Sequence, residues 1–245
     1  MITSRQNTLI KFIRSMADKK NRDENALFVV EGIKTVKEVF SAGLNVYALL
    51  LTEKAETLIP PEFISTAERV ETATEEIFSY ASGEVSPQGA LALVKKPEVK
   101  PYGKGNCLFL DGVGDPANVG AILRTAAASG FNDVFITNDS ADPYGAKAVR
   151  ASMSGVFRVN VITGERETLI KNLPSPVVVA DMKGKPVSEL KLDPPFCLCI
   201  GNEGRGVSEL LKNRADLTVS IPMENGMESL NAAVSAGILM YQLKK

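Results

Sequence analysis

The chain has 245 residues, of which 44% are hydrophobic and 23% charged, and its formal net charge is −1. This length allows one large domain or two small ones with a sizeable core, and the even balance of charge excludes a global field that would attract nucleic acid. The chain contains no histidine, which excludes a Ser-His-Asp or Cys-His triad, a histidine general base and zinc sites built with histidine.

Membrane and metal sites are not expected either. No run approaches the roughly 20 apolar residues of a membrane-spanning helix, and charges interrupt residues 1–20 throughout, unlike a secretory signal. We therefore expect a cytoplasmic protein. The three cysteines, Cys107, Cys197 and Cys199, form no disulfide framework and no CxxC pair. We expect Cys197 and Cys199 to lie on one face of a buried strand.

Hydrophobic periodicity predicts alternating helices and strands in the first part of the chain. A helix is expected to begin after Ser4, which would cap it, and to run toward a basic turn at 19–22. The elements expected next are a strand at 27–30, a helix at 33–40 with Gly43 suited to its C-terminal cap, a strand at 46–51, a helix at 73–81 and a strand at 90–94. This alternation is typical of an α/β sandwich, which we assign to residues 1–96.

A polar hinge separates this region from the rest of the chain. Residues 95–105 contain two prolines, two glycines and four lysines, and we predict a linker at 97–104. A second domain, 105–245, then repeats the alternation, with strands expected at 107–110, 134–137, 159–162, 177–180, 196–200 and 217–221, and helices at 119–129, 146–152, 165–172, 207–213 and 230–243. Continuous apolar strands separated by helices predict a parallel sheet covered on both faces.

The loop after the strand at 107–110 is the first of three unusual strand-to-helix connections. It reads Asp-Gly-Val-Gly-Asp-Pro-Ala-Asn over 111–118, and Asn118 is expected to cap the next helix. Within that helix Arg124 has only small neighbours one turn away, at 120, 121, 127 and 128. This stripe leaves room beside Arg124 for a ligand or another chain. The alternative is an arginine whose aliphatic stem covers the small residues.

The second and third connections are glycine-rich or polar. The segment 201–206, Gly-Asn-Glu-Gly-Arg-Gly, follows a buried strand, and its glycines would let backbone amides approach a ligand; the alternative is a plain turn. It matches neither dinucleotide nor triphosphate motifs. The segment 221–231 places Ser229 as the expected cap of the last helix, with Leu230 and Asn231 in its first turn. Converging polar loops of one parallel sheet predict a small-molecule site.

These segments resemble a known family. DPANVGAILRTAAASGF, GNEGRGVS and IPMENGMESLNAAVSAGILMYQL are similar, in order and spacing, to the three motifs of the SpoU (TrmH-like) RNA ribose 2′-O-methyltransferases of the SPOUT superfamily. Residues 4–43 resemble the family's N-terminal substrate-binding domain. The resemblance implies a ribosomal-protein-like α/β domain, followed by a parallel α/β domain with a trefoil knot, and a homodimer formed through the second domain.

The resemblance also implies the cofactor, S-adenosylmethionine, and the residues of its site. Polar residues expected at the reaction centre are Asn118, Arg124, Glu203, Ser229 and Asn231. Residues expected to hold the cofactor are Gly201, Asn202, Gly204, Ile221, Met223, Ser229 and Leu230. The chain departs from the family at Ala233, where a small polar residue is common, so no hydroxyl acts there. No metal is implied.

Basic residues concentrate near the N-terminus. Residues 1–37 hold eight Lys or Arg against four acids, a local excess of +4. Taken alone, this pattern favours a solvated helical face over a phosphate-binding patch. With the resemblance, we expect it to bind structured RNA, ribosomal rather than transfer RNA, through Arg5, Lys11, Arg14, Lys19, Lys20 and Arg22.

The ribose hydroxyl must lose a proton, and the chain offers Glu203, water or Arg124 as acceptor. A guanidinium pKa above roughly 12 disfavours Arg124 as a base, so we favour an electrostatic role for it beside the developing alkoxide or a phosphate. Two other functions remain open: a non-catalytic RNA-binding protein with this fold, and a SPOUT enzyme that methylates guanine. The intact motif residues argue against the first, and the Ser-Leu-Asn sequence at 229–231 with the loop at 201–204 favours ribose over base.

Overall fold

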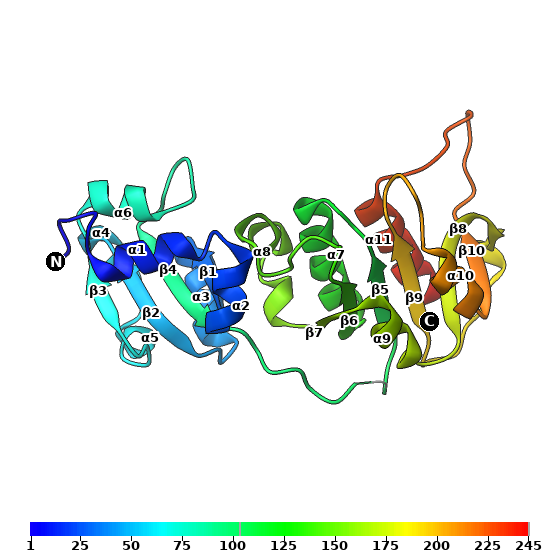
Figure 1. Ribbon diagram of the computed structural model, residues 1–245, viewed down its shortest axis with the longest axis horizontal. Coiled ribbons are helices and arrows are strands. Elements are labelled where there is room, and N and C mark those ends of the chain that lie inside the picture. Colours follow the sequence, from blue (N-terminus) through cyan, green and yellow to red (C-terminus); the bar gives the residue numbers. More distant parts are fainter. Residues whose placement is uncertain (103, 245) are drawn as a thin grey trace.

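The computed structural model describes residues 1–102 and 104–244. The molecule is elongated, and two β-sheets follow one another along its long axis (Figure 1). The first sheet has four strands in the order β1-β4-β2-β3, and the second has six in the order β10-β8-β9-β5-β6-β7. Within the described residues, no helix combines the length and the apolar character needed to cross a membrane.

The first part of the chain forms a mixed sheet with helices around it. Its elements are α1 (Thr8–Ser15), α2 (Lys19–Asn25), β1 (Leu27–Glu31), α3 (Ile33–Ser41), β2 (Val46–Leu51), α4 (Glu53–Glu56), α5 (Pro61–Ile64), β3 (Val70–Thr72), α6 (Glu75–Ala81) and β4 (Ala90–Lys95). The prediction of one first helix capped by Ser4 is wrong. Asn7 caps α1 and Asp18 caps α2, each by accepting a backbone N–H two residues ahead, so the polar turn between them divides the segment.

The second part forms a sheet in which every pairing is parallel, as predicted. Its elements are β5 (Cys107–Asp111), α7 (Pro116–Ser129), β6 (Asp133–Thr137), α8 (Ala146–Ser152), η1 (Gly155–Phe157), β7 (Asn160–Gly164), α9 (Arg166–Lys171), β8 (Val177–Pro186), η2 (Val187–Glu189), β9 (Cys197–Gly201), α10 (Glu209–Arg214), β10 (Leu217–Ser220) and α11 (Ala232–Leu243). The trefoil knot implied by the resemblance stays a prediction.

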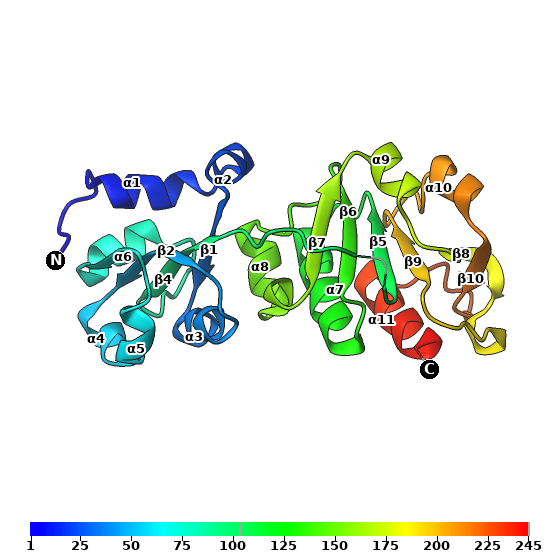
Figure 2. The ribbon, with the colours of Figure 1, turned by 90° about the horizontal axis from the view of Figure 1, so that it is seen from below.

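Successive side chains of the central strand β5 point to opposite faces of the sheet, and each face has its own hydrophobic core. Leu108 and Leu110 face the cluster that includes residues of α7 and α11, whereas Cys107 and Phe109 face a cluster with Cys197 and Cys199. Figure 2 shows α7, α8 and α11 on one face of the sheet and α9 and α10 on the other. The predicted placement of two thiols on one face of a buried strand is confirmed, and all three cysteines are buried and free.

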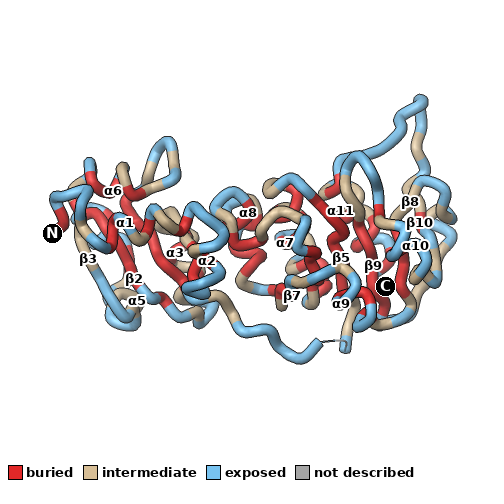
Figure 3. The backbone as a smooth tube through the Cα atoms, viewed as in Figure 1, coloured by how far each residue is buried: buried red, intermediate tan, exposed pale blue. Residues whose placement is uncertain are grey.

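The two sheets share one apolar core. A single buried cluster includes residues of both parts of the chain, and Figure 3 shows buried backbone on each side of the junction. The ring of Phe28 in β1 lies 5.1 Å from that of Tyr144 and 6.0 Å from that of Phe157, measured between centroids. Separation of the two parts would expose this shared apolar core to water, which is unfavourable.

Arg22 and Asp142 form a buried ion pair at this junction. The Arg22 Nε and Nη2 atoms lie 3.0 and 2.5 Å from Asp142 Oδ2, and Nη1 donates to the carbonyl oxygens of Met16 and Ala17. The two side chains are only 7% and 12% exposed. Arg22 is among the residues we expect to bind RNA, but its guanidinium is held at the junction of the two sheets, so we remove it from that group.

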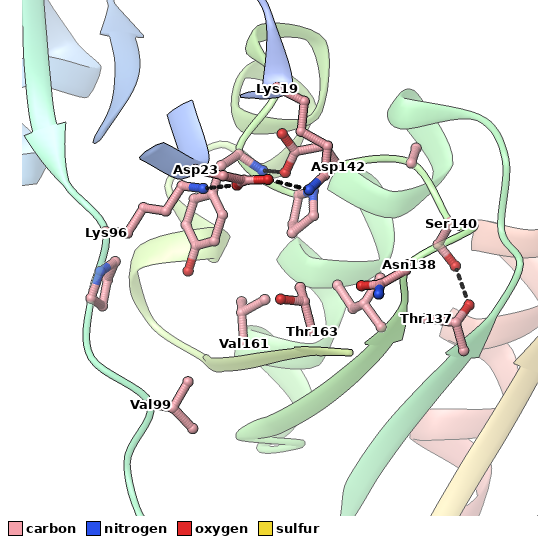
Figure 4. A pocket seen from close by; sticks show the side chains of 15 residues that line it. Lys19, Asp23, Lys96, Val99, Thr137, Asn138, Ser140, Asp142, Val161 and Thr163 are labelled. Carbon is pink, nitrogen blue, oxygen red and sulfur yellow. Dashed lines mark hydrogen bonds and ion pairs between the residues drawn. The ribbon is translucent and has the colours of Figure 1, made fainter. Parts of the chain in front are cut away.

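A pocket of about 150 Å³ also lies at the junction (Figure 4). Asp23 accepts hydrogen bonds there from Lys19 and Lys96, at 2.5 and 2.6 Å. Asn138 and Thr163 line it from the part of the chain that forms the six-stranded sheet. None of the predicted catalytic or cofactor-binding residues lines this pocket, so it is separate from the site described below.

Replacing Arg22 with Ala is expected to lower the free energy of unfolding by about 3 kcal/mol, because Asp142 is then left buried without its charged partner. The matched control is Lys19→Ala, which removes an exposed ion pair and is expected to cost less than about 1 kcal/mol. Urea unfolding followed by circular dichroism measures both. Equal losses in the two variants would show that burial of the pair has no energetic importance.

Candidate functional site

Three loops meet at the carboxyl edge of the second sheet. They are the segments 112–115 after β5, 202–208 after β9 and 221–231 after β10, and they lie along the upper edge of the molecule in Figure 1. Because β5 and β9 are parallel neighbours, their loops leave the sheet side by side. The third loop returns toward α7 because α11, which follows it, packs on that helix.

A chain of hydrogen bonds joins the three loops. The amide nitrogen Nδ2 of Asn118 donates to Glu203 Oε1 at 2.8 Å, and Asn231 Nδ2 donates to Asn118 Oδ1 at 2.9 Å. The backbone N–H of Gly114 also points to Glu203 Oε2, at 3.4 Å. The structure thus brings together three of the five residues expected at the reaction centre.

The helix caps explain how the two asparagines are placed, and they correct the sequence analysis. Asp115, rather than Asn118, caps α7 by accepting the N–H of Ala117 at 2.9 Å. Asn118 therefore lies inside the helix, with its side chain free to reach Glu203. Asn231, rather than Ser229, caps α11 through its Oδ1 atom, and its Nδ2 atom extends to the neighbouring loop.

The environment of Glu203 affects its protonation. Partial desolvation raises the pKa of this carboxyl, although the residue is exposed. Hydrogen bonds, of which the one from Asn118 is the largest, outweigh this effect and hold the pKa below its ordinary value. Glu203 is therefore ionised at neutral pH and is a weak proton acceptor. Its oxygens are occupied by the neighbouring loop, which indicates a positioning role.

The loop 202–206 is closed by its own backbone. The residues Asn202 and Gly206 exchange two backbone hydrogen bonds, of 3.0 and 2.9 Å. Asn202 Nδ2 donates to the carbonyl of Gly112, and its Oδ1 accepts the N–H groups of Gly204 and Arg205. A Cβ on Gly201 would lie 2.3 Å from the Gly206 carbonyl carbon. The requirement for Gly201 is thus close backbone packing, and the Asn202 amide braces the loop against its neighbour.

Arg124 lies exposed on α7 and forms no ion pair with any residue in the described part of the chain. The small residues around it are explained by packing. A Cβ on Gly120 would lie 2.4 Å from the carbonyl oxygen of Ala148 in α8, and one on Gly155 would lie 2.6 Å from the Arg124 Cα. Backbone of α8 and η1 therefore fills part of the space we expected beside the stripe, while the Arg124 side chain is left facing solvent.

A pocket of about 130 Å³ collects most of the residues expected to hold the cofactor. Ile221, Met223, Ser229 and Leu230 line it, whereas Gly201, Asn202 and Gly204 do not. The segment 180–182 of β8 lines the opposite side and was missed by the sequence analysis. The strand register shifts beside it, because Thr218 pairs with Val179 but Val219 pairs with Lys185, so this part of β8 bulges out of the sheet.

The pocket fits part of S-adenosylmethionine. Its apolar side chains suit an adenine ring, and Asp181, Ser220 and Ser229 offer oxygen atoms to ribose hydroxyls or to a positively charged group. Small-molecule sites usually measure about 300–1,000 Å³, so this pocket corresponds to only part of such a site. Among residues 1–102 and 104–244 no group of three or more His, Cys, Asp or Glu side chains could hold a metal ion.

Comparison with known proteins gives the same picture. The family model described as SpoU rRNA Methylase family matches residues 105–241, and the MRM3-like substrate binding domain matches residues 7–92. The chain is 31% identical, over 99% of its length and 98% of the relative's, to the 23S rRNA (guanosine(2553)-2′-O)-methyltransferase RlmP of Bacillus subtilis (strain 168).

Two solved structures are similar over nearly the whole chain. One is a putative RNA methyltransferase of the TrmH family from Porphyromonas gingivalis, with 31% identity, coverage of 100% of this chain and 98% of that chain, and a TM-score of 0.86. The other is an AdoMet-bound rRNA methyltransferase from Sinorhizobium meliloti, with 26% identity, coverage of 98% and 95%, and a TM-score of 0.86.

Replacing Asn118 with Ala is expected to raise the pKa of Glu203, because the largest of the hydrogen bonds that lower it is lost while partial desolvation of the carboxyl remains. The lowered pKa of Glu203 in the folded state means that its ionised carboxyl stabilises the fold at pH values above the pKa of the unfolded chain. This stabilisation disappears as the pH falls through the pKa of the folded state. Carbon-13 NMR titration of the glutamate carboxyls between pH 2 and 7, with Glu203→Gln for assignment, tests this. An unchanged Glu203 titration in Asn118→Ala would contradict the assigned cause.

Proposed function

Because the chain belongs to the SpoU rRNA methylase family, we propose that it transfers the methyl group of S-adenosylmethionine to a ribose 2′-hydroxyl of ribosomal RNA. The observation that carries this proposal is the hydrogen-bond chain from Glu203 through Asn118 to Asn231. It joins all three family motifs at one edge of the sheet, beside the pocket at 221–230. A protein that only bound RNA would have no need for this convergence.

The pocket residues would hold the cofactor in place. S-adenosylmethionine supplies a methyl group bound to a positively charged sulfur, and the neutral thioether is a good leaving group. Alignment of this methyl group with the ribose oxygen can therefore contribute much of the rate enhancement. Ile221, Met223 and Leu230 would pack against the adenine ring, and the Ser229 hydroxyl would orient a polar group. Asn231 is held by its cap and by Asn118, so it would present a fixed face to the ribose.

Arg124 is the residue we propose at the developing alkoxide. Its guanidinium faces solvent and has no ion-pair partner in the described chain, so it can meet a ribose oxygen or the adjacent phosphate. Glu203, ionised and hydrogen-bonded, would keep the loops in register instead of taking the proton. Water at the open edge of the site would then accept it.

We propose a division of labour along the chain. Residues 1–96 bind RNA, 97–104 link, and 105–245 carry out transfer; residues 103 and 245 lie outside those the structure describes. The basic side chains still proposed to contact RNA are exposed ones of the first domain, Arg5, Lys11, Arg14, Lys19 and Lys20. We place this activity in the cytoplasm.

We also propose a homodimer formed through α11. Val234 and Tyr241 on this helix are 50% and 57% exposed, which gives the second domain an apolar face suited to a second copy. Light scattering at micromolar concentration is expected to give twice the chain mass of 26.3 kDa, and Val234→Glu with Tyr241→Glu is expected to lower it. A monomeric mass for the unmodified protein would refute the dimer.

Replacing Arg124 with Ala is expected to reduce the single-turnover methylation rate by about 100-fold or more, with little change in cofactor affinity, because Arg124 does not line the pocket. Arg124→Lys separates the two roles of this residue. A lysine keeps the charge but loses the paired donors, so it is expected to be slow at every pH.

If Arg124 were a base, the Lys variant would instead regain activity steeply as pH rises. Rates of the three proteins across pH, with cofactor affinity from calorimetry, give the answer. Turnover of Arg124→Ala at the unmodified rate would remove this residue from the mechanism. Digestion of the labelled product to nucleosides separates ribose from base methylation, and methyl groups on guanine bases would overturn the proposed reaction.

A further inference from the structure

We propose that Lys147 and Arg150 of helix α8 bind backbone phosphates of an RNA that extends from the first domain to the methylation site. This inference rests on the proposed function and adds to it two contacts in the second domain. It starts from the position of α8, which lies between the first domain and α7 in Figures 1 and 2. The helix packs against both β1 and α7.

Two ion pairs connect α8 to its neighbours. Arg150 Nε lies 2.5 Å from Glu84 Oε1, in the loop after α6, and Lys147 Nζ lies 2.9 Å from Asp115 Oδ1, at the start of α7. Asp115 lies three residues before Asn118, which bonds to Glu203. The two basic side chains therefore span the interval between the first domain and the loops of the site.

The other α8 side chains explain why only this face is available. Ala148, Val149 and Ser152 are buried, and a close approach of Ala148 to Gly120 fixes the helix on α7. Residues three apart lie on one face of a helix, so Lys147 and Arg150 point outward together. Their spacing along a solvent-facing ridge suits a nucleic acid backbone.

The first-domain end of this path has the chemistry of RNA contacts. The Tyr80 ring has the Arg14 guanidinium 4.2 Å and the Arg5 guanidinium 4.9 Å from its centroid. Aromatic rings and guanidinium planes are surfaces on which unpaired bases stack. We call Tyr80 with Arg5 and Arg14 the Tyr80 platform. Arg14 and Ala146, the first residue of α8, line one hollow of about 310 Å³, so the Tyr80 platform and α8 border the same space.

The ion pairs of α8 are replaceable by phosphate. The side chains of Lys147 and Arg150 are 64% and 53% exposed, and exposed pairs typically contribute about 0–1 kcal/mol. Asp115 keeps its capping bond to Ala117 without Lys147. The acidic partners thus hold the two cations in extended positions at little cost, and an RNA phosphate can exchange for either carboxylate.

The test is the double variant Lys147→Gln, Arg150→Gln in the full chain, with Lys171→Gln on α9, across the sheet, as the matched control. The probe is deproteinised ribosomal RNA, titrated over a range of salt concentrations. We expect about tenfold weaker binding and a slope of log affinity against log salt that is smaller by about 1.4–1.8, at roughly 0.7–0.9 per phosphate contact. Lys171→Gln is expected to bind as the unmodified chain does.

Cofactor affinity and thermal unfolding of the double variant are expected to stay unchanged, and Lys147→Arg with Arg150→Lys is expected to restore binding and slope. The proposal is overturned if the double variant keeps the affinity and slope of the unmodified chain. It is also overturned if the charge-preserving variant is as weak as the double Gln variant. Failure of the proposed function is a different result, in which the unmodified chain itself transfers no labelled methyl group to RNA.

Discussion

The side-chain amide of Asn118 is the group on which the site depends. It donates to Glu203 and accepts from Asn231, so one planar group of four atoms fixes the relative positions of three loops that leave three different strands. An amide can do this because it offers a donor and an acceptor at once. Neither a carboxylate nor a hydrocarbon at this position could satisfy both neighbours, and the cap of α11 would lose its link to α7.

Much of the fold follows from local pattern. The continuous apolar runs at β5 and β9 predict a parallel sheet with two covered faces, and β2 and α8 have the bounds that the periodicity indicates. The chemistry of the three loops was equally visible in the sequence, because Gly, Asn and Glu directly after buried strands have few structural reasons to occur together. The short elements α4, α5 and β3 were missed, since each is too brief to show a period.

Some of the wrong predictions concern side chains that a distant residue holds in place, and others concern neighbouring residues that could fill the same role. Arg22 has the sequence context of a solvated basic turn, yet Asp142, 120 residues away, holds it inside the junction. Asp115 and Asn231 took the caps expected of Asn118 and Ser229, a choice between neighbouring polar residues that propensity alone cannot make. The contribution of 180–182 to the pocket depends on a register shift between β8 and β10, which is a property of the pair and is absent from either strand.

The shared core at the junction has a consequence for substrate choice. The two sheets are held together by the contact of Phe28 with Tyr144 and by the Arg22–Asp142 pair. These contacts keep Tyr80 at a set distance from Asn118. An enzyme built in this way can select its substrate by a fixed distance. Its selectivity would come from the span between a gripped RNA feature and the reacting ribose, so an RNA with suitable bases but the wrong span would bind without being modified.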